Sequence, residues 1–213
     1  LFLLQLPTPS ANPPSPESVS SERLGKTLQA VCAQERLAGS PGSKKATEYV
    51  ASVFEEAGLD VERATYSVYL PRQTAQGLCL IQANGRHLPL DLEEHGFPQD
   101  PQSHRGTVPP MHGSTGAGNV RGRLIFAGFG REEDFKFLKD QGIRTDGTIA
   151  LIRYGKLFRG QKVQNAEAAG CVGALLYTDS EDDGERKGKT MPRGPWRPID
   201  GIQRGSVFNG HGD

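Results

Sequence analysis

The first sixty residues contain two stretches in which apolar side chains recur with helical spacing. Leu24, Leu28 and Val31 follow one another at intervals of four and three residues, which places them on one face of a helix. The stretch 40–58 repeats this pattern, and Gly58 stands where a residue in the left-handed conformation would end the helix. We therefore expect two amphipathic helices in this part of the chain.

After residue 60 the helical spacing gives way to patterns that are typical of strands. The segment VERATYSVYLP (61–71) alternates apolar and polar side chains, as a half-buried strand does. The apolar runs GLCLI and RHLPL flank Asn84 and Gly85, a dipeptide that favours a tight hairpin turn. Residues 91–119 show no period and are rich in Pro, Gly and His, so we expect an ordered loop there.

The remaining part of the chain predicts strands that alternate with helices. RGRLIFAGFG predicts a strand, and REEDFKFLKDQG predicts a short helix closed by Gly142. TIALIRYG and VGALLYTD are apolar on both faces and flank a predicted helix, RGQKVQNAEAAG, as parallel strands joined by a crossover helix do. With one further short strand at GSVF, the expected fold class is mixed, α/β (α+β).

Charge and cysteine content exclude several classes of function. The formal net charge is zero and the pI is about 7.1, and no basic stripe with interleaved aromatic side chains occurs, so we expect no nucleic-acid partner. The three cysteines stand far apart and form no CxxC pair, which argues against a zinc ribbon, a redox motif and a disulfide framework. Any recognition of charge must therefore depend on individual side chains.

Motifs that carry catalysis are missing from the sequence. It contains neither HExxH nor GxSxG, and four histidines, His112 among them, lie in loop sequence without a carboxylate at helical spacing, so we expect surface or loop roles for them. His211-Gly212-Asp213 has the H-x-D form of some zinc peptidases, but it follows a turn rather than a buried strand. We therefore predict no catalytic residue and no metal ligand in this chain.

The N-terminal run LFLLQL is apolar but too short to span a bilayer, and a Pro/Ser-rich stretch follows it. We interpret residues 1–19 as the remnant of a signal peptide or membrane anchor followed by a linker. The alternative, that the sequence simply begins at an arbitrary point, stays open.

Phe158 and Arg159 lie between the end of an apolar strand and the start of the next helix, beside Gly155 and Gly160. Ligands of α/β folds often bind at such carboxyl ends of strands. An arginine there offers a planar, bidentate fork to a carboxylate, and the helix N-terminus adds backbone N–H donors. The alternative is a solvated surface arginine, so residue type and position leave two interpretations of Arg159.

The segments RYGKLFRGQKVQNAEAAGCVGALLYTD, REEDFKFLKDQGI and GIQRGSVFNGHGD resemble the protease-associated (PA) domain of one family of zinc metallopeptidases. This family contains glutamate carboxypeptidase II (prostate-specific membrane antigen) and the transferrin receptor. Upstream, RLAGSPGSKKATEYVASVFEEAGLDVERATYSVYLP resembles the segment that begins the family's peptidase domain. The resemblance covers about residues 20–213 and is strongest from 120 onward.

The resemblance implies a PA domain, a β-sandwich or barrel with flanking helices, inserted after the first helices of a split zinc-exopeptidase domain. Residues 20–70 would then be the N-terminal piece of the peptidase-like domain, and residues 71–213 the PA domain, truncated at its C-terminal end. The family's two zinc ions and catalytic glutamate would lie beyond Asp213. These 213 residues alone are therefore expected to be inactive.

The resemblance also implies a substrate-binding role for three residues. Phe158 and Arg159 match the family's FRG element, whose arginine binds the C-terminal carboxylate of a peptide while the phenylalanine lines the pocket wall. Ser206 stands where the family has an asparagine that contacts the same carboxylate. A serine has a shorter reach, so the resemblance favours a carboxypeptidase-like exopeptidase over a strictly glutamate-specific one.

The expected partners are a peptide substrate with a free C-terminus and, in the full-length protein, a second copy of the same chain. By the same resemblance, the parent protein would be membrane-anchored (type II) or secreted, with a vacuolar or endosomal location as a further option. Two alternatives remain, a non-catalytic protein like the transferrin receptor and a free-standing PA module that binds peptides or sorting partners. Retention of FRG argues against the first, and the helices before residue 60 argue against the second.

Overall fold

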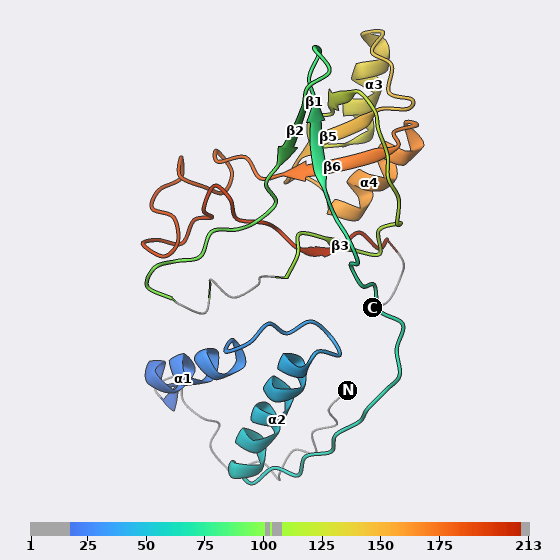
Figure 1. Cartoon of the computed structure of the whole chain (residues 1–213). Coiled ribbons are helices and arrows are strands. Elements are labelled where there is room, and N and C mark those ends of the chain that lie inside the picture. The colour runs from blue at the N-terminus through green and yellow to red at the C-terminus, as the bar shows by residue number, and fades with distance from the viewer. Residues whose placement is uncertain (1–17, 101–102, 104–107, 210–213) are drawn as a thin grey trace. The chain divides into compact units, whose positions relative to one another are not determined.

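A computed structural model of the chain describes residues 18–100, 103 and 108–209 (Figure 1). The chain divides into two compact units. The first comprises the described residues up to Arg72 and those between Gly96 and Val108, and the second comprises Gln73–His95 and the residues from Pro109 onward. The expected assignment of 20–70 and 71–213 to two domains of a parent protein stays a prediction.

The first unit contains two helices, α1 (Ser21–Val31) and α2 (Pro41–Glu56), as their spacing predicted. A serine hydroxyl caps each N-terminus: Ser20 accepts from the Arg23 N–H at 3.3 Å, and Ser40 accepts from the Ser43 N–H at 3.1 Å. Beyond the second helix, Gly58 has a φ of 79°, the left-handed conformation expected at that position.

The predicted strand at 61–71 is wrong. The structure forms no strand there, and the side chains of Tyr66, Val68 and Tyr69 are exposed. A strand needs a neighbour that accepts and donates its backbone hydrogen bonds, and the described part of the first unit contains no other strand to pair with. Alternation of apolar side chains therefore did not suffice for a strand in this unit.

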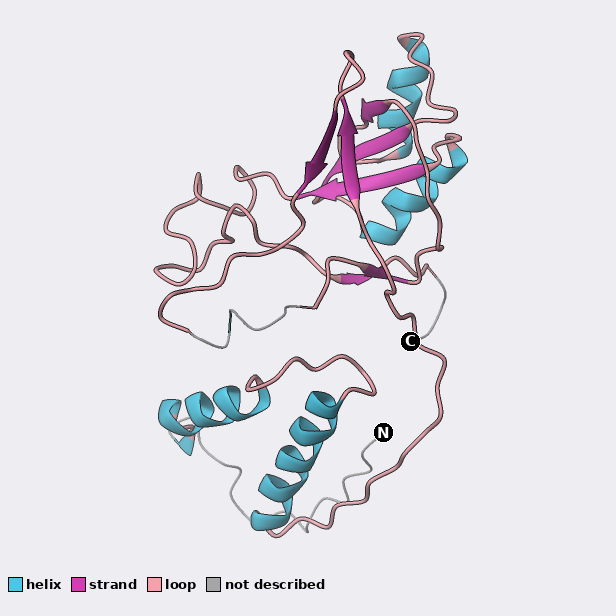
Figure 2. Cartoon of the chain, in the orientation of Figure 1, coloured by secondary structure: helices cyan, strands magenta, loops and turns pink. Residues whose placement is uncertain are grey.

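The second unit contains three small sheets (Figure 2). Strands β1 (Leu78–Ile81) and β2 (His87–Leu90) form the predicted antiparallel hairpin, with Gly85 at a φ of 81° in its turn. Strands β4 (Leu124–Phe126), β5 (Ile149–Arg153) and β6 (Gly173–Tyr177) form a parallel sheet in that order. In the third sheet, β3 (His112–Gly113) pairs in parallel with β7 (Gly205–Ser206).

Helices α3 (Glu132–Asp140) and α4 (Arg159–Ala168) cover one side of the parallel sheet (Figure 1). Helix α4 is the crossover between β5 and β6, as the sequence predicted. The core contains residues from all of these elements except β6: Ile125, Ala127, Phe135, Leu138, Ala150, Ile152 and Ala166. The mixed helix–strand class is confirmed, with its strands in small sheets.

Two expectations concern residues outside the described part of the chain. The apolar N-terminal run and the His211-Gly212-Asp213 segment both lie there. Within the described residues, no helix combines the length and the apolar composition that crossing a bilayer requires.

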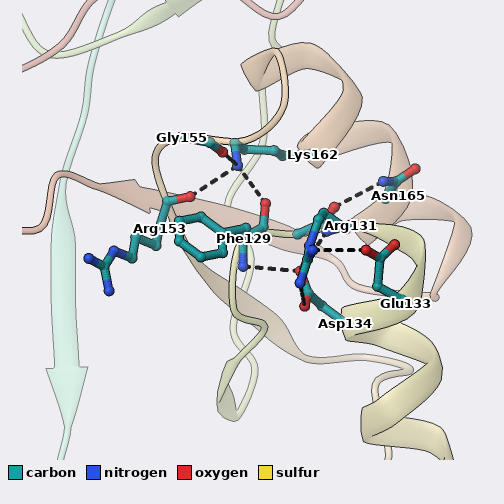
Figure 3. Close-up of polar contacts among 9 residues, drawn as sticks. Phe129, Arg131, Glu133, Asp134, Arg153, Gly155, Lys162 and Asn165 are labelled. Carbon is teal, nitrogen blue, oxygen red and sulfur yellow. Dashed lines mark hydrogen bonds and ion pairs between the residues drawn. The ribbon is translucent and has the colours of Figure 1, made fainter. Parts of the chain in front are cut away.

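Lys162, in the first turns of α4, is a fully buried charged side chain. Its ammonium group donates to the backbone carbonyl oxygens of Phe129, Arg153 at 3.0 Å and Gly155 at 2.6 Å (Figure 3). Burial lowers the pKa of Lys162, and the negative charge of Asp134 opposes this effect. Because an ammonium group has three protons, each of them has an acceptor, which makes the buried charge tolerable.

These contacts join α4 to two loops, one that lies 33 residues away along the chain and the one directly before the helix. The Phe129 carbonyl lies in the loop between β4 and α3, whereas the carbonyls of Arg153 and Gly155 lie where β5 leads into α4. The neighbouring Asn165 side chain also reaches the first of these loops, donating to the Gly130 carbonyl at 2.9 Å (Figure 3). Helix α4 therefore holds the two loops at the carboxyl ends of β4 and β5 in fixed positions.

We expect Lys162→Met to lower the free energy of unfolding of the second unit by about 2 to 4 kcal/mol, because methionine fills a similar volume but removes the donor from the carbonyls of Phe129 and Arg153. The Gly155 carbonyl also loses Lys162 but keeps a hydrogen bond from the Leu157 N–H at 2.8 Å. The measurement is urea denaturation followed by the fluorescence of Trp196, the only tryptophan of the chain, which lies in this unit. The control is Lys136→Met, an exposed lysine on α3 that pairs only with Asp140, for which we expect little change. Equal stability of the two variants would contradict the role given to Lys162.

Candidate functional site

The loop from β5 to α4 presents the candidate residues at the N-terminus of a helix. Gly155 and Lys156 both have positive φ values, 100° and 67°, so the chain turns sharply directly after β5. The Gly155 carbonyl is one of those held by Lys162. Phe158 is the N-cap residue of α4 and Arg159 its first residue, so a fixed turn determines where both side chains begin.

The structure brings the three candidate residues together. Arg159 Nη1 donates to the backbone oxygen of Ser206 at 3.3 Å, across 47 positions of sequence. The guanidinium carbon of Arg159 lies 5.4 Å from the centre of the Phe158 ring, within the range of a cation–π contact. The Phe158 side chain is 49% exposed, so the ring remains accessible from outside this unit.

Arg159 differs from its arginine neighbours in having no acidic partner. Among the residues that the structure describes, no carboxylate forms an ion pair with it, and its Nε is buried without a hydrogen-bond partner. The other partly buried arginines of this unit each pair with at least one carboxylate: Arg131, Arg153, Arg197 and Arg204. Arg159 is therefore a half-buried cation with unused donors, a state that an anionic ligand would relieve.

Two glycines allow α4 and β7 to approach each other closely. A Cβ atom on Gly205 would lie 2.5 Å from Arg159 Nη1, which is too close for any contact. A Cβ atom on Gly160 would overlap the backbone oxygen of Val207 and the side-chain oxygen of Asn209. Glycine at 205 therefore leaves room for the Arg159 guanidinium, and glycine at 160 leaves room for the chain after β7.

The hydroxyl group of Ser206 is engaged within this unit. Ser206 Oγ accepts from the Phe208 N–H at 2.9 Å and donates to the hydroxyl oxygen of Ser114 at 3.3 Å. Ser114 has a φ of 65°, so the segment after β3 turns there. To donate to a ligand, the Ser206 hydroxyl would have to exchange Ser114 for the ligand as its acceptor.

His112 and Tyr154 join this group, although the sequence pattern did not single them out. The Tyr154 hydroxyl lies 3.0 Å from His112 Nε2, and His112 Nδ1 lies 3.2 Å from the backbone oxygen of Gly205. His112 is a half-buried residue of β3, so the expected surface or loop role is wrong for this histidine. It lies in a segment without periodicity, and only its pairing with β7, 93 residues away, gives it this position.

Burial and the charge of Arg159 shift both titratable groups. Burial lowers the pKa of His112; the hydrogen bond to Gly205 opposes this effect, and the positive charge of Arg159 adds to it. Burial raises the pKa of Tyr154, against the charge of Arg159 and a hydrogen bond with it. Both groups are therefore neutral near pH 7.

A cavity of about 500 Å³ lies next to His112 and Tyr154. Its wall also includes the end of β6 and the segment that leads to β7, with Tyr177, Arg197, Asp200 and Ile202. Phe158, Arg159 and Ser206 do not line it. The three candidate residues thus lie outside this cavity. His112 and Tyr154 line the cavity and also lie next to the candidate residues.

Within residues 18–100, 103 and 108–209, no group of three or more His, Cys, Asp or Glu side chains is placed to hold a metal ion. The three cysteines are free thiols, with Cys171 packed against the core.

Residues 108–208 match the family model of the PA domain. The chain is 32% identical over 208 residues to a glutamate carboxypeptidase 2 homolog of Caenorhabditis briggsae, which covers 92% of this chain and 27% of that protein. It is 34% identical over 188 residues to the probable glutamate carboxypeptidase LAMP1 of Arabidopsis thaliana, covering 87% and 27%. It is 30% identical over 209 residues to the aminopeptidase NAALADL1 of Mus musculus, covering 92% and 27%.

The chain spans about a quarter of the length of these relatives. Among solved structures, it is similar to an aminopeptidase from Aneurinibacillus sp. strain AM-1, with a TM-score of 0.41 and 19% sequence identity. That match covers 90% of this chain and 35% of the other.

We expect Gly160→Ala to lower the free energy of unfolding of the second unit by about 1 to 3 kcal/mol, because the added methyl group overlaps the backbone oxygen of Val207, directly after β7. Alanine favours a helix over glycine by up to about 1 kcal/mol, so a net loss requires that the steric clash outweighs helix propensity. The measurement is again denaturation followed by Trp196 fluorescence. Gly116→Ala is the control, since a Cβ atom at Gly116 meets nothing and its φ is not positive; a stabilised Gly160→Ala variant would contradict the close approach.

Proposed function

We propose that this chain, which matches the PA-domain model over residues 108–208 and is similar to glutamate carboxypeptidase homologues, is the N-terminal and PA-domain portion of a zinc-dependent, carboxypeptidase-like exopeptidase. In this proposal the PA domain binds the C-terminal carboxylate of a peptide substrate. The two zinc ions and the catalytic residues belong to a part of the parent protein beyond Asp213, so this chain contributes binding and no chemical step. Because it spans about a quarter of its relatives, the activity concerns the parent protein.

The observation that carries the proposal is the missing counter-ion of Arg159. A terminal carboxylate has two oxygens in a plane, which match two N–H groups of a guanidinium. Arg159 Nη1 already donates to Ser206 and the Nε–H is buried, so the donors that remain for a ligand are on the two Nη atoms of the guanidinium. In a site closed from water, such a charge-assisted interaction contributes on the order of 2 to 5 kcal/mol.

The N-terminus of α4 supports the same ligand. The helix has no acidic residue in its first turn, and no side chain caps its N-terminus. The positive end of the helix dipole and the first backbone N–H groups therefore favour a negative charge near Arg159.

Phe158 and Ser206 would contact the same end of the substrate. The exposed Phe158 ring forms an apolar wall next to the guanidinium, and the Ser206 hydroxyl donates one hydrogen bond to the carboxylate. Serine reaches less far than the asparagine of the family's pattern. We therefore propose a broader preference for the C-terminal residue than for glutamate alone.

The family resemblance supports two further parts of the proposal: that the full-length protein forms a homodimer, and that it is membrane-anchored or secreted.

We expect Arg159→Ala in the full-length enzyme to raise KM for peptides with a free C-terminus by about 30-fold or more, with kcat nearly unchanged, because the contact binds substrate and transition state equally. Arg159→Lys should recover part of the loss, since lysine keeps the charge without the bidentate fork. The control is Arg193→Ala, an exposed arginine of the same unit that forms no ion pair in the described structure. Unchanged kinetics of Arg159→Ala would contradict the proposal.

A matched pair of substrates separates the carboxypeptidase proposal from an aminopeptidase, the activity in the name of the mouse relative. We expect C-terminal amidation of a peptide to lower kcat/KM strongly in the wild type and to make Arg159→Ala and wild type nearly equal, because the amide removes the charge that Arg159 binds. An aminopeptidase would hydrolyse the free and amidated peptides at similar rates, and that result would exclude our proposal.

A further inference from the structure

We propose that His112 and Tyr154 are positioning residues for Arg159: their hydrogen bonds fix Gly205 of β7, next to the Ser206 carbonyl that accepts from Arg159, and so hold the guanidinium in the orientation that a carboxylate requires. This inference rests on the function proposed for Arg159. It adds two residues that bind no substrate themselves and act through that side chain.

The Gly205 carbonyl determines the direction of both hydrogen bonds of His112. A carbonyl oxygen only accepts, so His112 Nδ1, at 3.2 Å from it, must carry a proton. A neutral imidazole then has an unprotonated Nε2, which accepts from the Tyr154 hydroxyl at 3.0 Å. Burial raises the pKa of Tyr154, and the positive charge of Arg159 acts on the same hydroxyl to lower it.

The hydrogen bonds of His112 and Arg159 meet on the same short strand. One acceptor is the Gly205 carbonyl, and the next residue, Ser206, provides the carbonyl that accepts from Arg159 Nη1 at 3.3 Å. The pairing of β3 with β7 sets His112 opposite Gly205, and the Val207 N–H donates to Gly113 at 3.0 Å. His112 and Arg159 are therefore hydrogen-bonded to the carbonyls of two adjacent residues of β7, Gly205 and Ser206.

Positioning matters because an arginine side chain is long and flexible. Holding it in one rotamer before the substrate arrives removes much of the entropic cost of binding. The Ser206 carbonyl gives Arg159 Nη1 a fixed acceptor, because His112 holds the preceding residue, Gly205, in place. Its remaining donors are then presented in a defined direction.

The charged surroundings favour the neutral form of His112. Arg159 on α4 is the charged group that acts on this ring, and Arg197 acts on Tyr154 from the segment before β7. Within the described part of the chain no carboxylate forms an ion pair with His112. Because the folded-state pKa lies below the ordinary value of 6.5, the unfolded chain binds more protons between these two values. Stability therefore falls as the pH decreases below about 6.5, and it is fully present above that value.

The main experiment measures KM and kcat of full-length variants on a peptide with a free C-terminus. We expect Tyr154→Phe to raise KM about tenfold with kcat nearly unchanged, and the same change to have no further effect in an Arg159→Ala background. Tyr177→Phe is the matched control, because Tyr177 lines the same cavity but forms no hydrogen bond with His112. His112→Leu should match Tyr154→Phe, and His112→Gln should recover part of the loss by accepting from the tyrosine.

A second measurement needs no activity. In the 213-residue chain with nitrogen-15-labelled histidine, long-range proton–nitrogen NMR at pH 7 should show His112 as the neutral tautomer with its proton on Nδ1. A proton on Nε2, or a charged imidazolium at this pH, would overturn the hydrogen bonds proposed from Tyr154 through His112 to Gly205.

The outcomes separate the two proposals. If Arg159→Ala leaves KM unchanged, the carboxylate-binding function fails, whatever the tautomer of His112. If Arg159→Ala raises KM but Tyr154→Phe does not, or if the two changes multiply their effects, the function stands and the positioning role is wrong.

Discussion

The buried ammonium group of Lys162 is the interaction on which the candidate site depends. It brings the carbonyls of Phe129, Arg153 and Gly155 to one point, and in doing so it holds the turn between β5 and α4 (Figure 3). A buried charge is costly unless each of its protons has an acceptor, and here each one has. The same requirement makes the geometry specific, because only one arrangement of the loops places three carbonyls around the ammonium.

This fixed turn delivers Arg159 to a place where its charge has no counterpart. The neighbouring arginines, such as Arg153 with Asp182 and Arg197 with Asp183, are neutralised within the fold and stabilise it. Within the described residues, Arg159 instead donates to the backbone carbonyl of Ser206, which orients the guanidinium without neutralising it. A cation that is oriented but not neutralised suits the recognition of an anion, since binding then needs neither reorganisation nor the loss of an existing ion pair.

The division of labour within the family follows from this arrangement. Under the proposed function, the PA domain would recognise the charge at the end of a peptide with an oriented cation, while the chemistry would take place elsewhere in the parent protein. The two close approaches at Gly160 and Gly205 show how strongly the site depends on local packing, because a single methyl group at either position occupies the space of the guanidinium or of the chain after β7. Specificity for the C-terminal residue would then depend on the groups around Arg159, Ser206 among them.

The sequence by itself determined the elements whose hydrogen bonds close locally. The helices α1 and α2 with their serine caps, the hairpin at Asn84-Gly85 and the crossover helix between two apolar strands all follow from patterns within about thirty residues. The FRG element and its resemblance to a known family also identified Arg159 as a candidate. Tertiary structure alone decided that the alternating segment 61–71 forms no strand, that Lys162 is buried, and that His112 meets Tyr154 and Gly205. Each of these outcomes depends on a partner far away in the chain, and apolar periodicity carries no information about which distant carbonyl, strand or ring will supply the missing hydrogen bond.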